Sequence, residues 1–129
     1  MVTPSQDDLP DHVPGYRLIH DAQRIVRLEG KGNYTLVYLL DHARPILVSY
    51  TLKRFEAHLP TYIRIHRSAL INPAYVSQVS RATPRLMFVK LTTGESMPVS
   101  RHRMQVTSIR LNRKKPVRFF YHFSSLPTF

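Results

Sequence analysis

Nine polar residues in three short segments carry the side chains most able to recognise an anionic polymer. The planar guanidinium forks of Arg67 and Arg101 match the O6 and N7 edge of guanine, and the carboxamide of Asn33 can pair with adenine in the same bidentate way. These three are the candidate base-reading residues. Six neighbours suit phosphate oxygens, contacts that fix register on a duplex without reading its sequence: Lys31, Arg64, His66, Ser68, Ser100 and Arg103.

Several of these residues also have an ordinary structural role open to them. Arg64 could be an ion-pair partner on a sheet face, and His66 an ordinary half-buried histidine. Ser100 could simply begin the last helix as its N-cap. Taken singly, each residue fits the structural role at least as well as the recognition role.

The charge of the chain favours an anionic partner. Residues 22–129 hold 18 Lys and Arg against four Asp and Glu, whereas residues 1–21 hold four Asp and one Arg. A compact domain with this excess carries a positive potential that attracts polyanions. Long apolar stretches are lacking and the N-terminus is acidic and rich in proline, so we expect neither a membrane span nor a signal peptide. The expected location is the cytoplasm, without a membrane partner.

The sequence lacks the combinations of residues that catalysis or metal binding requires. It has no cysteine, which excludes a thiolate nucleophile, a zinc finger and a Cys-ligated iron–sulfur cluster. Its seven histidines show no HxH or HExxH spacing, and carboxylates are scarce in the basic region. We therefore predict that the chain is not an enzyme and has no metal site and no cofactor.

Short apolar runs separated by turn signals predict a strand-rich domain. Tyr34–Leu40 is apolar on both alternations, which is typical of a strand covered on both faces. The expected strands are Ile25–Glu29, Tyr34–Leu40, Ile46–Tyr50, Tyr62–His66, Tyr75–Val79, Leu86–Leu91 and Glu95–Val99.

One of these strands determines where a candidate residue lies. Ile63 and Ile65 take the buried alternation of the strand that ends at His66, and Arg67 would share it if the strand continued. Burying an unpaired guanidinium is too costly. We therefore expect the strand to end or bulge near His66, which leaves Arg67 at the surface.

Two segments have a helical period. Leu52, Phe55 and Leu59 fall on one helix face, with Thr51 as N-cap and Pro60 as the stop. A second helix is expected after Ser100, from Arg101 to about Leu111. Its apolar residues divide between two sides, Met104 and Leu111 on one, Val106 and Ile109 on the other.

In this order, the motifs resemble the LytTR domain, the DNA-binding module of many bacterial response regulators. The resemblance runs from about residue 25 to residue 111, roughly two-thirds of the chain. Its anchors are Leu28-Glu29 to Asn33-Tyr34, Thr51-Leu52 to Leu59-Pro60, Ile63-Arg64 with His66-Arg67-Ser68, Ile71-Asn72, and Pro98-Val99-Ser100-Arg101.

The resemblance implies a mainly β fold of about ten short strands in small stacked antiparallel sheets, with one or two short helices. It also implies sequence-specific binding of double-stranded DNA for transcriptional regulation. Loops of this family, rather than a recognition helix, enter successive major grooves, and two copies bind spaced direct repeats. By motif position, the base-reading residues are Asn33, Arg67 and Arg101, whereas Glu29 and Asn72 take structural roles as a loop support and a turn cap.

The expected organisation is a flexible acidic, proline-containing arm (1–21), a LytTR-like domain (22–112) and a basic-aromatic tail (113–129). Family members commonly carry an N-terminal receiver domain, for which residues 1–21 are too few. We therefore expect a stand-alone module or a fragment of a longer chain. A second protomer on the DNA and a signalling partner protein are further expected partners. The tail aromatics are predicted to pack on the second helix or against a second protomer.

Two other functions remain open at this point. A basic β module could bind RNA or single strands by stacking bases on Tyr34, Tyr38 or Tyr75. The chain could also act through protein contacts, as an antagonist of a full-length regulator.

Overall fold

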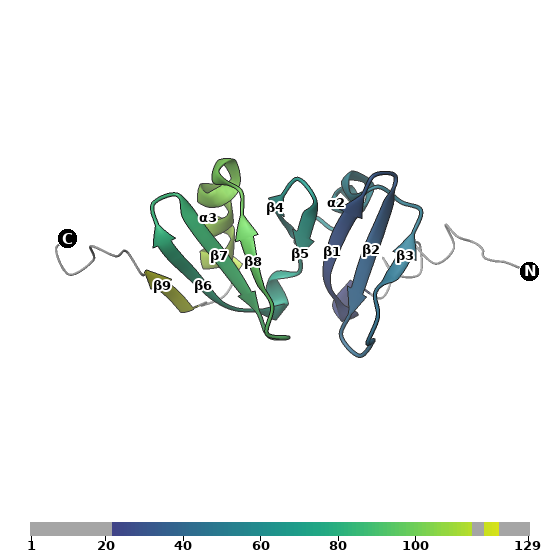
Figure 1. Cartoon of the computed structure of the whole chain (residues 1–129), viewed down its shortest axis with the longest axis horizontal. Coiled ribbons are helices and arrows are strands. Elements are labelled where there is room, and N and C mark those ends of the chain that lie inside the picture. The colour runs from purple at the N-terminus through teal and green to yellow at the C-terminus, as the bar shows by residue number, and fades with distance from the viewer. Residues whose placement is uncertain (1–21, 115–117, 122–129) are drawn as a thin grey trace, which may run out of the picture.

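The structure is a computed structural model that describes residues 22–114 and 118–121. These residues form two β-sheets that lie side by side, with helices packed against them (Figure 1). The mainly β fold class is confirmed, with nine strands among the described residues where about ten were expected. In chain order the elements are η1 (Ala22–Arg24), β1 (Ile25–Lys31), β2 (Tyr34–Leu39), β3 (Ile46–Val48), α2 (Leu52–His58), β4 (Ile63–His66), β5 (Ala69–Ile71), η2 (Pro73–Tyr75), β6 (Val76–Thr83), β7 (Leu86–Leu91), β8 (Ser96–Val99), η3 (Arg101–Arg103), α3 (Met104–Lys114) and β9 (Arg118–Tyr121).

The N-terminal sheet has the strand order β3-β2-β1-β5-β4, and all its neighbours are antiparallel. Helix α2 covers one face and buries Leu52 and Phe55, as the helical period predicts. Thr51 is its N-cap, and the Thr51 side chain accepts a hydrogen bond from the backbone N–H of Arg54. Packing on the sheet is what holds this two-turn helix, which would be marginal alone.

The prediction that the second strand is covered on both faces is wrong for β2. Thr35, Val37 and Leu39 are buried, whereas Tyr34 is exposed and Tyr38 half-buried. The face that carries Tyr38 has the guanidinium of Arg27 over the tyrosine ring, not a second apolar layer.

The C-terminal sheet has the order β8-β7-β6-β9. The first three strands are antiparallel, but β9 pairs with β6 in parallel, from Gln78 opposite Arg118 to Arg81 opposite Tyr121. Among the described strands, the pairing of β9 with β6 is the one that departs from the antiparallel arrangement of the fold. A parallel neighbour needs a crossover, and α3 supplies it by returning the chain to the end of the sheet where β6 begins. The tail thus adds a strand, while the packing predicted for its aromatic side chains lies outside what the structure describes.

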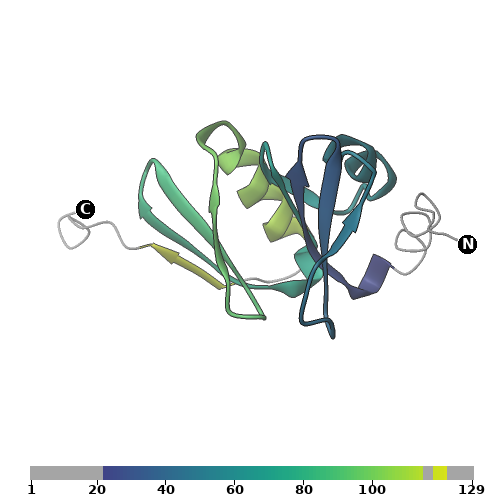
Figure 2. The same ribbon diagram turned by 45° about the vertical axis from the view of Figure 1, so that its right-hand side comes forward.

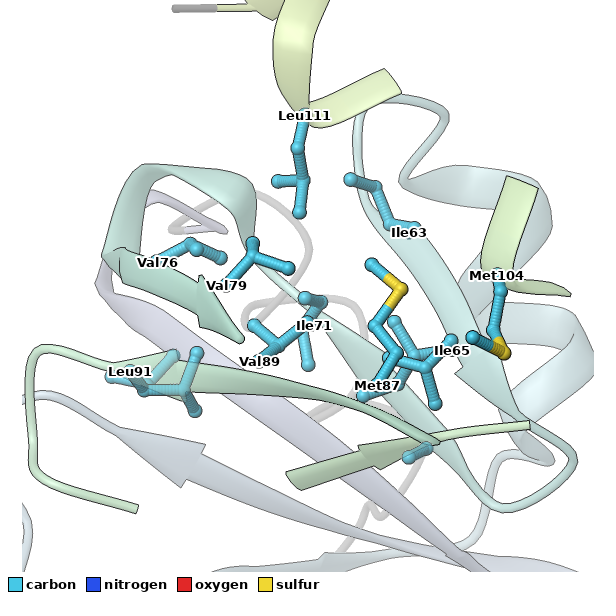
Figure 3. Close-up of a cluster of buried hydrophobic side chains, with 13 residues drawn as sticks. Ile63, Ile65, Ile71, Val76, Val79, Met87, Val89, Leu91, Met104 and Leu111 are labelled. Atoms are coloured by element: carbon cyan, nitrogen blue, oxygen red, sulfur yellow. The ribbon is translucent and has the colours of Figure 1, made fainter. Parts of the chain in front are cut away.

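A second core lies between the C-terminal sheet, the β4–β5 hairpin and α3 (Figure 3). It joins Ile63 and Ile65 of β4 to Met87 of β7, and α3 contributes Met104 and Leu111. The opposite side of α3 leaves Val106 54% and Ile109 43% exposed, so the prediction of a helix that is apolar on two sides is confirmed. Within the described ranges, no helix is long and apolar enough to cross a bilayer.

The turn between the two sheets depends on Asn72. Its side chain accepts from the backbone N–H of Ala74 at 3.0 Å and donates to the carbonyl of Ile25 at 2.8 Å and to the Tyr62 hydroxyl at 3.1 Å. The turn-cap role predicted for Asn72 is confirmed. Burial raises the pKa of the Tyr62 phenol, which therefore remains a neutral donor, here to the carbonyl of Ala22.

Candidate nucleic-acid interface

The three predicted recognition segments meet at one edge of the molecule. The β1–β2 turn, the β4–β5 turn and the junction between β8 and α3 form a row along the top of Figure 1, and Figure 2 shows the same row after rotation. Asn33, Arg67 and Arg101 belong to these three connections in turn, and all three residues are exposed. The fold thus brings together the three candidate base-reading residues from across the sequence.

The β1–β2 turn presents Asn33 and Lys31. Gly32 takes a φ of 63°, a left-handed conformation that glycine adopts without strain. The Nζ of Lys31 lies 3.4 Å from an oxygen of Glu29, and Glu29 also accepts from the hydroxyl of Tyr38 at 3.2 Å. Glu29 therefore supports the base of the turn, the role that the resemblance implied for it.

Arg64 holds the β4–β5 turn from within. Its Nε donates to the carbonyl of His66 at 3.0 Å, one terminal nitrogen donates to the carbonyl of Arg67, and the other lies 2.6 Å from an oxygen of Glu56 in α2. These bonds occupy all three guanidinium nitrogens with the turn and α2. They favour a positioning role for Arg64, and its contact with phosphate stays a prediction.

His66 and Ser68 bracket Arg67 and bond to each other. The backbone N–H of Ser68 donates to Nδ1 of His66 at 3.2 Å, and the Ser68 hydroxyl lies 3.0 Å from the same nitrogen. Because Nδ1 accepts, a neutral imidazole carries its proton on Nε2. The Nε2–H group is then a donor of the kind that a phosphate oxygen accepts.

The third segment is the start of the last helix. Ser100 occupies the N-cap position of η3, the turn that leads into α3, but its side chain makes no capping hydrogen bond. Arg101 and His102 are exposed, and Arg103 is half-buried. Inside the described parts of the chain, no ion pair engages Arg67 or Arg101.

Backbone hydrogen bonds tie the three connections together. The N–H of Gly30 donates to the carbonyl of Ser68 at 2.9 Å, and the N–H of Ser100 donates to the carbonyl of Ile65 at 2.8 Å. A Cβ at Gly30 would lie 3.3 Å from the Cβ of Leu52, so a larger residue would push α2 away. Backbone contacts therefore contribute to the spacing between the turns.

A polar contact that the sequence does not indicate joins the two sheets. Arg27, only 9% exposed, donates from Nε and a terminal nitrogen to the two carboxylate oxygens of Glu95, at 3.0 and 2.8 Å. Its guanidinium carbon lies 3.6 Å from the centre of the Tyr38 ring. Burial acts to lower the pKa of Arg27, but Glu95 and Tyr38 outweigh it and raise that pKa. The hydrogen bonds from Arg27 hold the pKa of Glu95 below its ordinary value.

Two of the three tyrosines that could stack on bases have other contacts. Tyr38 lies under Arg27 and bonds to Glu29, and the Tyr75 hydroxyl donates to the carbonyl of Gln23 at 2.6 Å. Tyr34, 48% exposed, keeps an accessible ring. One accessible ring gives little support to binding of single strands by a series of stacked bases.

Further cations outside the sequence motifs lie beside the candidate residues. Lys53 borders a cavity of about 280 Å³ with Gly32 and Arg67, and His102 lies next to Arg101. Their sequence signal is only that they are basic neighbours of a motif. Over the described residues, no group of three or more His, Cys, Asp or Glu is arranged to hold a metal ion.

Comparison with known proteins assigns this arrangement to a family. The profile of the LytTr DNA-binding domain matches residues 17–111. Among solved structures, the chain is similar to the LytTr DNA-binding domain of a protein from Bacillus cereus described as a methyl-accepting/DNA response regulator, at 25% identity and a TM-score of 0.61, covering 69% of this chain and 82% of that one. No curated protein matches the chain. The resemblance is therefore confirmed, and the chain belongs to the LytTr family of DNA-binding domains, which is not a family of enzymes.

Proposed function

We propose that this domain regulates transcription by binding double-stranded DNA at specific sequences, with its three connections facing successive major grooves. The observation that carries the proposal is the common edge: Asn33, Arg67 and Arg101 are exposed there on separate connections. Each has the bidentate group that base edges require. The cations and hydroxyls beside them suit the phosphates on either side.

The three side chains differ in how firmly their surroundings hold them. Arg67 follows a strand whose last carbonyl is bonded to Arg64, so its backbone is fixed. Arg101 lies in a short helical turn that is tied to β4 through Ser100. Asn33 sits in a two-residue turn beside Gly32. We therefore assign most of the discrimination between bases to Arg67 and Arg101.

Binding of two copies to direct repeats is part of the same proposal and rests on the family membership. A second protomer on the DNA and a signalling partner protein are its further partners. A DNA partner also favours the expected cytoplasmic location. Duplex binding and protein contacts are compatible, so site selection separates from this proposal only a chain that acts solely as an antagonist of a full-length regulator, without specific DNA binding.

Selection of bound sites from a random duplex library tests the proposal directly. We expect an enriched motif, repeated at a fixed spacing if two copies bind. The logarithm of the binding constant for the selected site should fall linearly with the logarithm of salt concentration, with a slope of about −0.9 for each phosphate neutralised. Absence of any enriched sequence, or equal affinity for structured RNA at matched salt, would overturn it. A chain that acts only as an antagonist would select nothing and bind duplexes without preference.

Variants of the two arginines then test the assigned residues. Arg67→Ala and Arg101→Ala should each lose about 1–3 kcal/mol of discrimination at one base pair. Their melting temperatures should stay near that of the wild type, because both side chains are exposed. Arg44→Ala is the matched control, since Arg44 is exposed in the turn between β2 and β3, at the opposite edge of the sheet. If the control loses as much discrimination, or the variants lose stability but not preference, the assignment is wrong.

A further inference from the structure

We propose that the β6–β7 turn is a fourth DNA-contacting connection, which binds phosphates of the duplex through Arg81 and Arg85 next to the base-reading Arg101. The inference rests on the proposed function and extends its interface beyond the three recognised segments. Neither arginine belongs to a motif that the sequence analysis identified.

The first observation is a basic cavity of about 690 Å³ between this turn and the start of α3. Arg81, Pro84 and Arg85 line it on the side of the turn, and Arg101, His102 and Gln105 on the side of the helix. No Asp or Glu lies among its lining residues. Three guanidinium groups around one cavity repel one another, and an anion placed between them relieves that repulsion.

The second observation is where the turn lies. In both Figure 1 and Figure 2 the β6–β7 turn continues the row formed by the β8–α3 junction, the β4–β5 turn and the β1–β2 turn. A duplex that contacts Arg101 at this edge therefore passes close to the β6–β7 turn. Because Arg101 itself lines the cavity, the phosphates beside the base pair it reads are the nearest anions on such a duplex.

Hydrogen bonds order the turn next to the two arginines, of which Arg81 lies near the end of β6 and Arg85 in the turn itself. A terminal nitrogen of Arg81 donates to the carbonyl of Pro84 at 3.2 Å, and the backbone N–H of Arg85 donates to the Thr83 hydroxyl at 3.1 Å. Both acceptors are neutral oxygens. These bonds therefore order the turn and leave the positive charges of Arg81 and Arg85 available to an anion. Arg85 itself is exposed.

The shape and lining of the cavity favour a backbone phosphate over a small anionic ligand. Sites for small molecules bury most of their ligand against apolar side chains. Here the cavity opens widely to solvent, and three arginines, a histidine, a glutamine and a serine line it together with Pro84, Met104 and Ile109. Such a surface matches the sequence-independent part of DNA binding, where cations meet phosphates at a wet boundary.

The test uses the full chain and the DNA site that it selects. We expect Arg81→Gln/Arg85→Gln to bind that site more weakly, with a salt slope shallower by about 1.8, because two phosphate contacts are lost at about 0.9 each. The preference among base pairs should be unchanged. Arg81→Lys/Arg85→Lys keeps the charges and should keep most of the slope. Backbone protection in a hydroxyl-radical footprint should shrink only at the end of the site next to the base pair read by Arg101.

A matched control removes two positive charges elsewhere. Arg44→Gln/Lys90→Gln changes two exposed residues away from the proposed edge and should leave the slope near that of the wild type. If Arg81→Gln alters the turn, a change in melting temperature reveals it, and Arg85→Gln alone should still reduce the slope by about 0.9. Equal slopes for the glutamine double variant and the control would overturn the inference. Failure of the wild type to prefer any sequence would instead overturn the proposed function.

Discussion

Replacing Glu95 by glutamine should destabilise the fold by removing the charge that opposes buried Arg27. Arg27 is 9% exposed, and its guanidinium donates two hydrogen bonds to separate carboxylate oxygens of Glu95, at 3.0 and 2.8 Å. A glutamine offers one acceptor oxygen in place of two and carries no charge. The variant therefore leaves one N–H without its acceptor and a cation without its nearest counter-charge.

The size of the loss in stability depends on how deeply the Arg27–Glu95 pair is buried. Breaking a fully buried pair costs about 3–5 kcal/mol. Here the Glu95 side chain is 43% exposed and Glu29 remains 3.8 Å from Arg27, so water and a second carboxylate compensate part of the loss. We expect about 1–2 kcal/mol at neutral pH, the range of a hydrogen bond to a charged group that is partly in water. For a domain of this size that corresponds to a fall in melting temperature of about 4 °C for each kcal/mol.

The pH dependence separates this explanation from a simple packing defect. Arg27 lowers the pKa of Glu95, so Glu95 stabilises the fold above the pKa it has in the unfolded chain. That contribution is lost as the pH falls through the lowered pKa of the folded state. The glutamine does not titrate, so the difference in stability between wild type and Glu95→Gln should narrow below about pH 4.

Thermal and urea unfolding at several pH values between neutral and about pH 3 measure this difference. Asp41→Asn is the control, because Asp41 is exposed in the turn after β2 and no ion pair engages it within the described residues. The reasoning is refuted if the difference in stability between wild type and Glu95→Gln stays constant across this pH range. It is also refuted if Glu95→Gln is not destabilised at neutral pH. The control should shift the melting temperature by much less at every pH.

Three further outcomes test other parts of the structure. Lys31→Ala should weaken binding to all duplexes about equally, because Lys31 is exposed in the β1–β2 hairpin. Salt titrations should show a slope that is shallower by up to about 0.9. Phe55→Ala should cost about 3–5 kcal/mol in urea unfolding, because the ring is fully buried between α2 and the N-terminal sheet. Thr107→Val should raise the melting temperature slightly, because the buried Thr107 hydroxyl finds no hydrogen-bond partner among the described residues.

Local signals were sufficient to predict much of this fold. Leu52 and Phe55 fix the buried face of α2 by their spacing alone, and Thr51 marks its start because a hydroxyl at that position satisfies a free N–H. The cost of burying an unpaired guanidinium predicts that Arg67 lies at the surface, and the strand does end at His66 with Arg67 exposed. In each case, the determining interaction lies within a few residues along the chain.

Long-range contacts could not be predicted in the same way. Arg27 has a carboxylate close by in sequence, Glu29 at 3.8 Å, but the partner of its bidentate hydrogen bond, Glu95, is 68 residues away. The cavity beside Arg101 likewise draws Arg81 and Arg85 from another hairpin. The parallel position of β9 depends on where α3 returns the chain, which the composition of the tail does not encode.

The interface depends on how the two sheets are held together. Asn33 and Arg67 are carried by the N-terminal sheet, whereas Arg101 follows the last antiparallel strand of the C-terminal sheet. The successive grooves of a duplex have a fixed spacing. The three side chains can therefore reach them together only if the boundary between the two sheets is rigid. The apolar core between the sheets holds them together, but apolar contacts are not directional and do not fix how one sheet is placed along the other. The bidentate bond from Arg27 to Glu95 and the hydrogen bond from Ser100 to Ile65 are directional, so sliding one sheet past the other would break both. Residues that never meet a base thus set the spacing at which bases would be read.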